Sequence, residues 1–265
     1  MIITCADSHA GLLERYLEQE YVFNTFLLAD LRLYGASAPF QDTWADVENG
    51  VCRAVYMRFY QNLMVYGEAV DGAFVRSLLK RFPISVIMGK QELVERLSGD
   101  AGDGYILRCK RLCMLEGEDA LQPDAGRARR AEPADAGRIH RFLQSLPEFT
   151  SLYASGEMIA DRIRNNDGIH LMLEQDGEIV SHGNSTAGAG RTVMLGGVGT
   201  APAFRGRGYA SEIVSALSRA VLAEGKKPCV FCGRGPEENL FDRLGFRTVG
   251  GWATLEAVER TGIDE

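Results

Sequence analysis

A short run of glycine and arginine, Arg-Gly-Arg-Gly-Tyr-Ala at residues 205–210, has the composition of a phosphate-binding turn. An apolar run at residues 193–200 precedes it and a helical pattern follows it, so the order is strand, bend and helix. The first N–H groups of a helix have no partner inside the helix and lie at the positive end of its dipole. Glycine allows close approach of the backbone, and arginine adds charged donors. The pattern predicts a pyrophosphate site.

Two widespread phosphate-binding motifs do not fit this turn. A Walker A loop needs Gly-Lys-Ser/Thr, but no lysine lies between Lys110 and Lys226. A Rossmann fingerprint needs a third glycine, where Ser211 stands here, and an acid about 20 residues further on that follows a strand. The acid nearest that distance, Glu224, ends a helical pattern instead. The phosphate site therefore belongs to another class.

The segment resembles motif A of the GNAT superfamily of N-acetyltransferases, whose core is Arg/Gln-x-x-Gly-x-Gly/Ala. Arg205, Gly208 and Ala210 occupy its three defined positions. Downstream, residues 244–246 are Leu-Gly-Phe, which is similar to the end of motif B in the same superfamily. The resemblance implies acetyl-CoA as co-substrate. It places the CoA contacts at Val198, Gly199, Thr200, Arg205, Gly206, Arg207, Gly208, Tyr209, Ala210 and Phe241.

The chain that follows the turn has the order of elements expected of such a domain. Apolar residues recur at helical spacing over residues 210–221, and Gly225 stands where a helix C-terminal cap belongs. Residues 228–232 predict a short buried strand, and residues 236–244 predict a second helix with a proline in its first turn.

The chain before the turn predicts a β-hairpin. Residues 169–174 and 178–186 are strand-like, and Gln-Asp-Gly at residues 175–177 joins them. Together with the resemblance, these elements imply an α/β fold: a GNAT acyl-CoA N-acyltransferase domain with a mixed, mostly antiparallel sheet flanked by helices.

The length of 265 residues exceeds one such domain and predicts two. Residues 116–126, rich in acids, glycine and proline, form the expected boundary, which gives domains at 1–120 and 126–265. The first half alternates helical and strand patterns but has no phosphate turn. Its segment Phe-Leu-Leu-Ala-Asp-Leu at 26–31 resembles the N-terminal domain of two-domain bacterial GNAT proteins, which is a degenerate GNAT-like half. We expect this half to shape the acceptor cleft or an interface and not to bind CoA.

Composition excludes several classes of partner. A net charge of −7 argues against nucleic acid, and no apolar run is long enough to span a membrane, so we expect a cytoplasmic protein, with a homodimer left open. The six cysteines predict reduced, buried thiols. Cys229 and Cys232 would point to opposite faces of a strand, and the four histidines lack ligand spacing, so no metal is expected.

The sequence does not identify the general acid or the general base. GNAT motif B usually has a tyrosine four residues before its Gly-Phe, but this chain has Phe241 there. Tyr153 or Tyr209 could supply a phenol instead, and water or the incoming ammonium could supply the proton. For a general base, His182 and Glu174 on the predicted hairpin are candidates, although a strand histidine is more often a hydrogen-bonded or surface side chain.

The function implied by the resemblance is transfer of an acetyl group from acetyl-CoA to a primary amine of a small-molecule or amino-acid-like acceptor, by direct attack. One alternative is a non-catalytic acyl-CoA-binding sensor or regulatory protein. It is suggested by the missing tyrosine and by residues 193–200, which lack the glutamate that some GNAT enzymes have on the strand before the turn. Another is an acyltransferase that uses a longer acyl-CoA or a protein N-terminus. The sequence does not name the acceptor.

Overall fold

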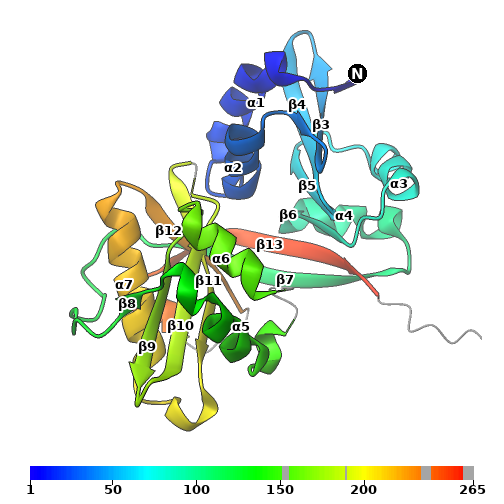
Figure 1. Ribbon diagram of the computed structural model, residues 1–265. Coiled ribbons are helices and arrows are strands. Elements are labelled where there is room, and N and C mark those ends of the chain that lie inside the picture. The colour runs from blue at the N-terminus through cyan, green and yellow to red at the C-terminus, as the bar shows by residue number, and fades with distance from the viewer. Residues whose placement is uncertain (151–154, 189, 234–239, 259–265) are drawn as a thin grey trace, which may run out of the picture. The chain divides into compact units, whose positions relative to one another are not determined.

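The computed structural model describes residues 1–150, 155–188, 190–233 and 240–258 (Figure 1). The chain divides into two compact units, the first formed by Met1–Leu112 with Val249–Glu265 and the second by Cys113–Thr248. These bounds do not coincide with the expected domains, 1–120 and 126–265. The reason is the last strand, β13 (Arg247–Ala257), in which Trp252 to Glu256 pair with Lys90 to Val86 of β6 in the first unit.

The first unit is an α/β unit with its helices inserted between strands (Figure 1). Its strands β1, β3, β4, β5 and β6 lie in that order, and all neighbours are antiparallel except β5 and β6, which are parallel. The elements are β1 (Ile2–Thr4), α1 (Ala10–Leu17), α2 (Thr25–Tyr34), β2 (Ser37–Ala38), β3 (Gln41–Glu48), β4 (Val51–Phe59), β5 (Asn62–Gly67), α3 (Gly72–Arg81), β6 (Val86–Lys90), α4 (Gln91–Ala101) and β7 (Tyr105–Met114).

Strand β4 shows why this sheet is covered on both faces. Val55 and Met57 pack into a cluster with residues of α1 and α2, whereas Ala54 and Tyr56 pack into another with residues of α3 and α4. All four side chains are fully buried. Successive strand residues point to opposite faces, so an uninterrupted apolar run is what a strand between two layers of helices requires.

The second unit has the same order of elements. Strands β8 to β12 lie in sequence order, with antiparallel neighbours except for the parallel pair β11 and β12. The elements are β8 (Arg129–Arg130), α5 (Ala136–Gln144), η4 (Pro147–Phe149), α6 (Gly156–Arg164), β9 (His170–Gln175), β10 (Glu178–Thr186), β11 (Thr192–Thr200), η5 (Pro202–Phe204), α7 (Tyr209–Ala223), β12 (Lys227–Cys232) and α8 (Leu240–Arg243). The predicted hairpin and the helix after the glycine turn are confirmed. Part of the helix predicted at 236–244 falls outside the described residues.

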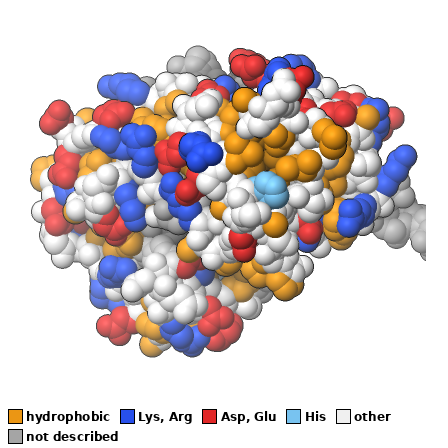
Figure 2. Space-filling view, turned by 90° about the horizontal axis from the view of Figure 1, so that it is seen from above, with side chains coloured by type: hydrophobic (Ala, Val, Ile, Leu, Met, Phe, Trp, Pro, Cys, Tyr) orange, Lys and Arg blue, Asp and Glu red, His pale blue; other side chains and the backbone are white. Residues whose placement is uncertain are grey.

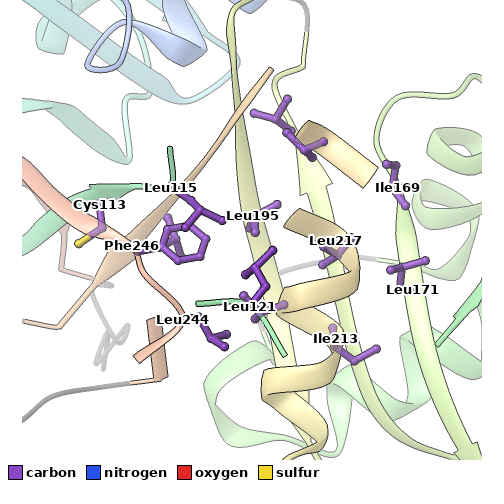
Figure 3. Packing of buried hydrophobic residues seen from close by; sticks show 14 of the residues in the cluster. Cys113, Leu115, Leu121, Ile169, Leu171, Leu195, Ile213, Leu217, Leu244 and Phe246 are labelled. Atoms are coloured by element: carbon purple, nitrogen blue, oxygen red, sulfur yellow. The ribbon is translucent and has the colours of Figure 1, made fainter. Parts of the chain in front are cut away.

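Helices cover both faces of this second sheet as well. Helix α7 packs Ile213 and Leu217 against Leu171 and Leu195 of the strands (Figure 3). The contact is close, because a Cβ at Gly183 of β10 would lie 2.6 Å from Ile213. On the opposite face, the buried side chains of α5 and α6 join Met172 and Ile179. The expected fold class, an α/β fold with a mixed and mostly antiparallel sheet between helices, is confirmed.

The surface carries charges of both signs. On the face shown in Figure 2, acidic and basic side chains are interspersed, and hydrophobic side chains gather in one area. Among the described residues, no helix has the length and apolar character needed to cross a bilayer.

Candidate functional site

The two parallel strands of the second unit separate along their length. β11 and β12 pair through Thr192 to Met194 and Lys227 to Cys229, and the described residues show no further pairs between these two strands. β11 nevertheless continues to Thr200. Its last residues therefore keep backbone groups on this edge that can bond to a ligand, because a strand's N–H and C=O groups need partners.

A bulge lies in the same part of β11. The pairing of β11 with β10 shifts between His182 and Asn184, and Gly197 has a φ of 55°. A Cβ at Gly197 would lie 2.5 Å from the Asn184 side-chain oxygen, so glycine is required for both conformation and space. The bulge turns the end of β11 relative to its start.

A cavity of about 520 Å³ lies at this end of the strand. It is lined by the end of β11, by the glycine turn with the start of α7, by η4 and by α8. Eight of the ten residues predicted to contact CoA line it, namely Val198, Gly199, Thr200, Arg205, Gly206, Gly208, Tyr209 and Ala210. The sequence prediction and the geometry thus point to the same place in the fold.

The other two predicted contacts do not line this cavity. The guanidinium of Arg207 lies over the ring of Phe204 at 5.2 Å from its centroid. The ring of Phe241 packs edge-on against buried Phe246, with centroids 5.6 Å apart. The phenyl group at the position of the usual tyrosine therefore faces core side chains.

The glycine turn has the local geometry of an anion site. Gly206 and Gly208 have φ values of 76° and 84°, which side chains other than glycine's rarely adopt. Gly208 is the N-cap of the 15-residue helix α7, and no side chain caps it. The N–H groups of the first turn and the positive end of the helix dipole are therefore available to an anion.

The acid in the first turn of α7 is neutralised. Glu212 is buried and accepts two hydrogen bonds from the guanidinium of Arg127, one of them at 3.1 Å. The same guanidinium lies over the ring of Tyr209, 5.5 Å from its centroid. This pairing keeps a carboxylate in the first turn without opposing an anionic ligand there.

Of the predicted acid–base residues, His182 lies beneath the bulge and not in the cavity wall. Its side chain is fully buried, and its Nδ1 lies 3.0 Å from the carbonyl oxygen of Gly197. Its Nε2 lies 3.1 Å from Nδ1 of buried His170. Burial lowers the pKa of His182 to about 4 and that of His170, with help from its neighbour His182, to about 3. The two histidines form a neutral, buried pair that holds the bulge carbonyl.

Glu174 is also outside the cavity wall. Its carboxylate accepts from Arg129 at 3.0 Å and from Arg138 at 2.6 Å, and these bonds hold its pKa below its usual range. The contacts connect β9 with β8 and α5. Tyr153, the third candidate, lies outside the described residues.

The cavity wall also contains residues that the sequence analysis did not predict as CoA contacts: Glu148, Phe149, Phe204, Ser211, Leu240 and Arg243. Glu148 and Phe149 belong to η4, and Glu148 precedes Arg205 at the start of the glycine turn by 57 residues. A Cβ at Gly199 would lie 2.5 Å from Leu146 and 2.9 Å from Phe149, so this segment packs directly on the backbone of β11. Pro147 signals a turn there, but no spacing links it to the phosphate motif.

The first unit differs at the corresponding helix start. Helix α3, which lies between its parallel strands as α7 does in the second unit, is capped by Asp71. The Asp71 carboxylate accepts from the N–H groups of Ala73 at 2.7 Å and Phe74 at 3.3 Å. A carboxylate already occupies the position that a phosphate would take, so the first unit lacks this anion site.

Residues 189–255 match a family model described as FR47-like protein. Over almost its whole length, the chain superimposes on a solved Drosophila protein with a TM-score of 0.72, at 15% identity and 98% and 99% coverage. A GCN5-related N-acetyltransferase from Sphaerobacter thermophilus gives a TM-score of 0.62 at 16% identity, with 100% and 98% coverage. The chain has the GNAT fold. A further GCN5-related N-acetyltransferase, from Kribbella flavida, gives 0.57 at 18% identity, with 77% and 86% coverage.

The predicted resemblance to the GNAT superfamily is confirmed by these matches at the level of the fold. No curated protein sequence matches the chain significantly. In the described part of the chain, no three His, Cys, Asp or Glu side chains gather as a metal site would require. All six cysteines are free thiols, and burial raises the pKa of Cys229 to about 12.

Proposed function

We propose that this GNAT protein transfers an acetyl group from acetyl-CoA to a primary amine of a small-molecule or amino-acid-like acceptor. One observation carries the proposal: a single cavity contains both the uncapped start of α7 and the end of β11, which pairs with β10 but not with β12. The first feature suits the pyrophosphate of CoA, and the second suits a thioester carbonyl that needs a hydrogen-bond donor.

In this proposal, the glycine turn at the start of α7 and the end of β11 bind different parts of acetyl-CoA. The pyrophosphate would lie against the turn from Gly206 to Ala210, where two glycines leave the backbone accessible. The acyl group would lie along residues 198–200. There, a backbone N–H can stabilise the negative charge that develops on the carbonyl oxygen. Holding donor and acceptor together in one cavity would also lower the entropic part of the barrier.

In the reaction, the neutral amine forms a C–N bond with the acetyl carbon while the C–S bond breaks and the CoA thiolate leaves. The nitrogen loses one proton and the thiolate gains one. A thiol ionises near pH 8.5, so its departure needs less acid assistance than that of an alkoxide. This chemistry is compatible with Phe241 in place of a tyrosine, since water or the incoming ammonium can supply the proton.

The test is release of free CoA from acetyl-CoA, measured with a thiol reagent, across a panel of primary amines. We expect CoA release that depends on one class of amine and stays at background without an amine. A parallel panel with a longer acyl-CoA and with an N-terminal peptide separates the alternative acyltransferases. A silent panel combined with measurable acetyl-CoA binding would instead favour a non-catalytic sensor, the second candidate that Phe241 motivates.

A further inference from the structure

The cavity wall contains an ion pair that the proposed reaction does not explain. The Arg205 Nη2 lies 3.2 Å from Oε1 of Glu148, and the Arg205 Nε donates to the carbonyl of Thr200 at 3.1 Å. Both side chains are about half exposed, 51% for Arg205 and 54% for Glu148. Among the described residues that line the cavity, Glu148 is the one carboxylate.

Glu148 is held in place by its neighbours. Leu146 is fully buried, and Phe149 packs against Gly199, the residue whose missing Cβ makes room for both. The two residues that flank the Pro147–Glu148 step therefore fix η4 on the strand end where the acyl group would lie. Glu148 therefore lines the same cavity as the strand end and the glycine turn.

Arg205 lies between the turn proposed for the pyrophosphate of CoA and the carboxylate of Glu148. It directly precedes the turn proposed for the pyrophosphate, and it holds the carboxylate of Glu148. An exposed carboxylate–guanidinium pair contributes little, because solvent screens it. A phosphate offers arginine a stronger, two-pronged charge-assisted contact. A bound pyrophosphate is therefore expected to take Arg205 away from Glu148.

We infer that Glu148 binds the ammonium group of the acceptor and that Arg205 masks this carboxylate until an acyl-CoA is bound. The inference rests on the proposed function and deepens it. The acceptor class becomes a cationic amine, and binding of the donor favours binding of the acceptor. Because coupling between two ligands is reciprocal, the acceptor also strengthens binding of the donor by the same factor.

The first test uses CoA itself, which binds without reacting, in titration calorimetry. Glu148→Gln removes the competitor for Arg205, so CoA is expected to bind up to about fivefold more tightly, the effect of one exposed ion pair. Glu224→Gln is the matched control. Glu224 is 51% exposed and pairs with Lys226 at 2.9 Å beyond the far end of α7, so this variant should bind CoA as the wild type does.

The Arg205→Gln variant distinguishes two mechanisms by which Glu148 could weaken CoA binding. Glu148 could hold Arg205 away from the phosphates, or it could repel the phosphates directly. In Arg205→Gln, the partner is gone, and adding Glu148→Gln should leave CoA affinity unchanged. If the gain in affinity persists in that background, Glu148 acts through space and the masking by Arg205 is refuted. Equal CoA affinity of wild type and Glu148→Gln, both with Arg205, also refutes it.

The acceptor arm uses the amine found in the turnover panel or, without turnover, calorimetry of the same amines in the presence of CoA. Glu148→Gln should raise the KM or Kd of a cationic amine by tenfold or more, with a smaller change in kcat. An unchanged KM or Kd overturns the ammonium site. Failure of the wild type to bind CoA at all would contradict the proposed function, whereas normal CoA binding without these differences contradicts this inference alone.

Discussion

Replacement of Gly208 by valine is expected to weaken acetyl-CoA binding by 100-fold or more. Gly208 has a φ of 84°, a conformation that a β-branched residue adopts only at a cost of about 1–3 kcal/mol. No atom lies within 4 Å of a Cβ built at this position, and Gly208 lines the cavity. The new side chain would therefore stand in ligand space, and relief of its strain would turn the first N–H groups of α7 away. Titration calorimetry with acetyl-CoA measures the loss.

The chain contains a matched control for this substitution. Gly225 follows the opposite end of α7, has a φ of 72° and also has no atom within 4 Å of an added Cβ. Gly225→Val therefore carries a similar backbone cost without altering the cavity. It should lower the free energy of unfolding about as much as Gly208→Val and leave acetyl-CoA affinity unchanged. Wild-type affinity in Gly208→Val, or an equal loss in both variants, would show that the turn does not bind the donor.

The glycine turn and helix α7 could be predicted from the sequence. The turn and its flanking strand and helix are contiguous, and glycine at positive φ leaves a mark in the sequence. The apolar spacing of Ile213 and Leu217 then gave the buried face of α7. These features depend on local geometry, which residue types and spacing encode directly.

Glu148 and Phe149 depend instead on tertiary packing. They reach the cavity because η4 rests on the backbone of β11 at Gly199. The sequence analysis placed Gly199 among the CoA contacts, but its packing against η4 could not be predicted without knowing the partner segment. The pairing of β13 with β6 also joins segments that are far apart in the sequence. The apolar pattern of β13 does not specify which strand lies beside it, so this pairing could not be predicted.

The environment of His182 could not be predicted from the sequence either. The hairpin pattern placed His182 on a strand but did not predict how deeply its side chain is buried. The structure buries it next to His170, and burial of both rings shifts their pKa values away from the range useful to a base at neutral pH. A histidine that looked available for proton transfer thus has a structural contact, to the bulge at Gly197.

This buried pair is expected to make the second unit sensitive to mild acid. The carbonyl of Gly197 can only accept, so Nδ1 of His182 carries the proton and its Nε2 accepts from Nδ1 of His170. Both rings must be neutral for this arrangement. Their folded pKa values, about 4 and about 3, lie below the ordinary 6.5, so the unfolded chain binds protons first as the pH falls. Stability is complete above pH 6.5 and is lost progressively below it.

Between pH 7.5 and pH 5, each histidine should remove about 2 kcal/mol from the free energy of unfolding, because one pKa unit corresponds to about 1.4 kcal/mol. Asp135 and Glu174, whose arginine partners lower their pKa values, lose their contribution only at more acidic pH. Both tryptophans, Trp44 and Trp252, lie in the first unit and would not report on this one. Amide hydrogen exchange of β10 and β11, corrected for its intrinsic pH dependence, measures the opening free energy directly.

His182→Gln separates the histidine pair from general acid effects. It removes one of the two titrating groups, so its loss of opening free energy between pH 7.5 and pH 5 should be about half that of the wild type. Its stability at pH 7.5 should fall by about 1–3 kcal/mol, because the contacts to Gly197 and His170 are disturbed. His140→Gln, in α5 and outside the pair, should keep the full wild-type loss. If His182→Gln loses as much as the wild type, acid weakens the unit through other groups and the pair is not its cause.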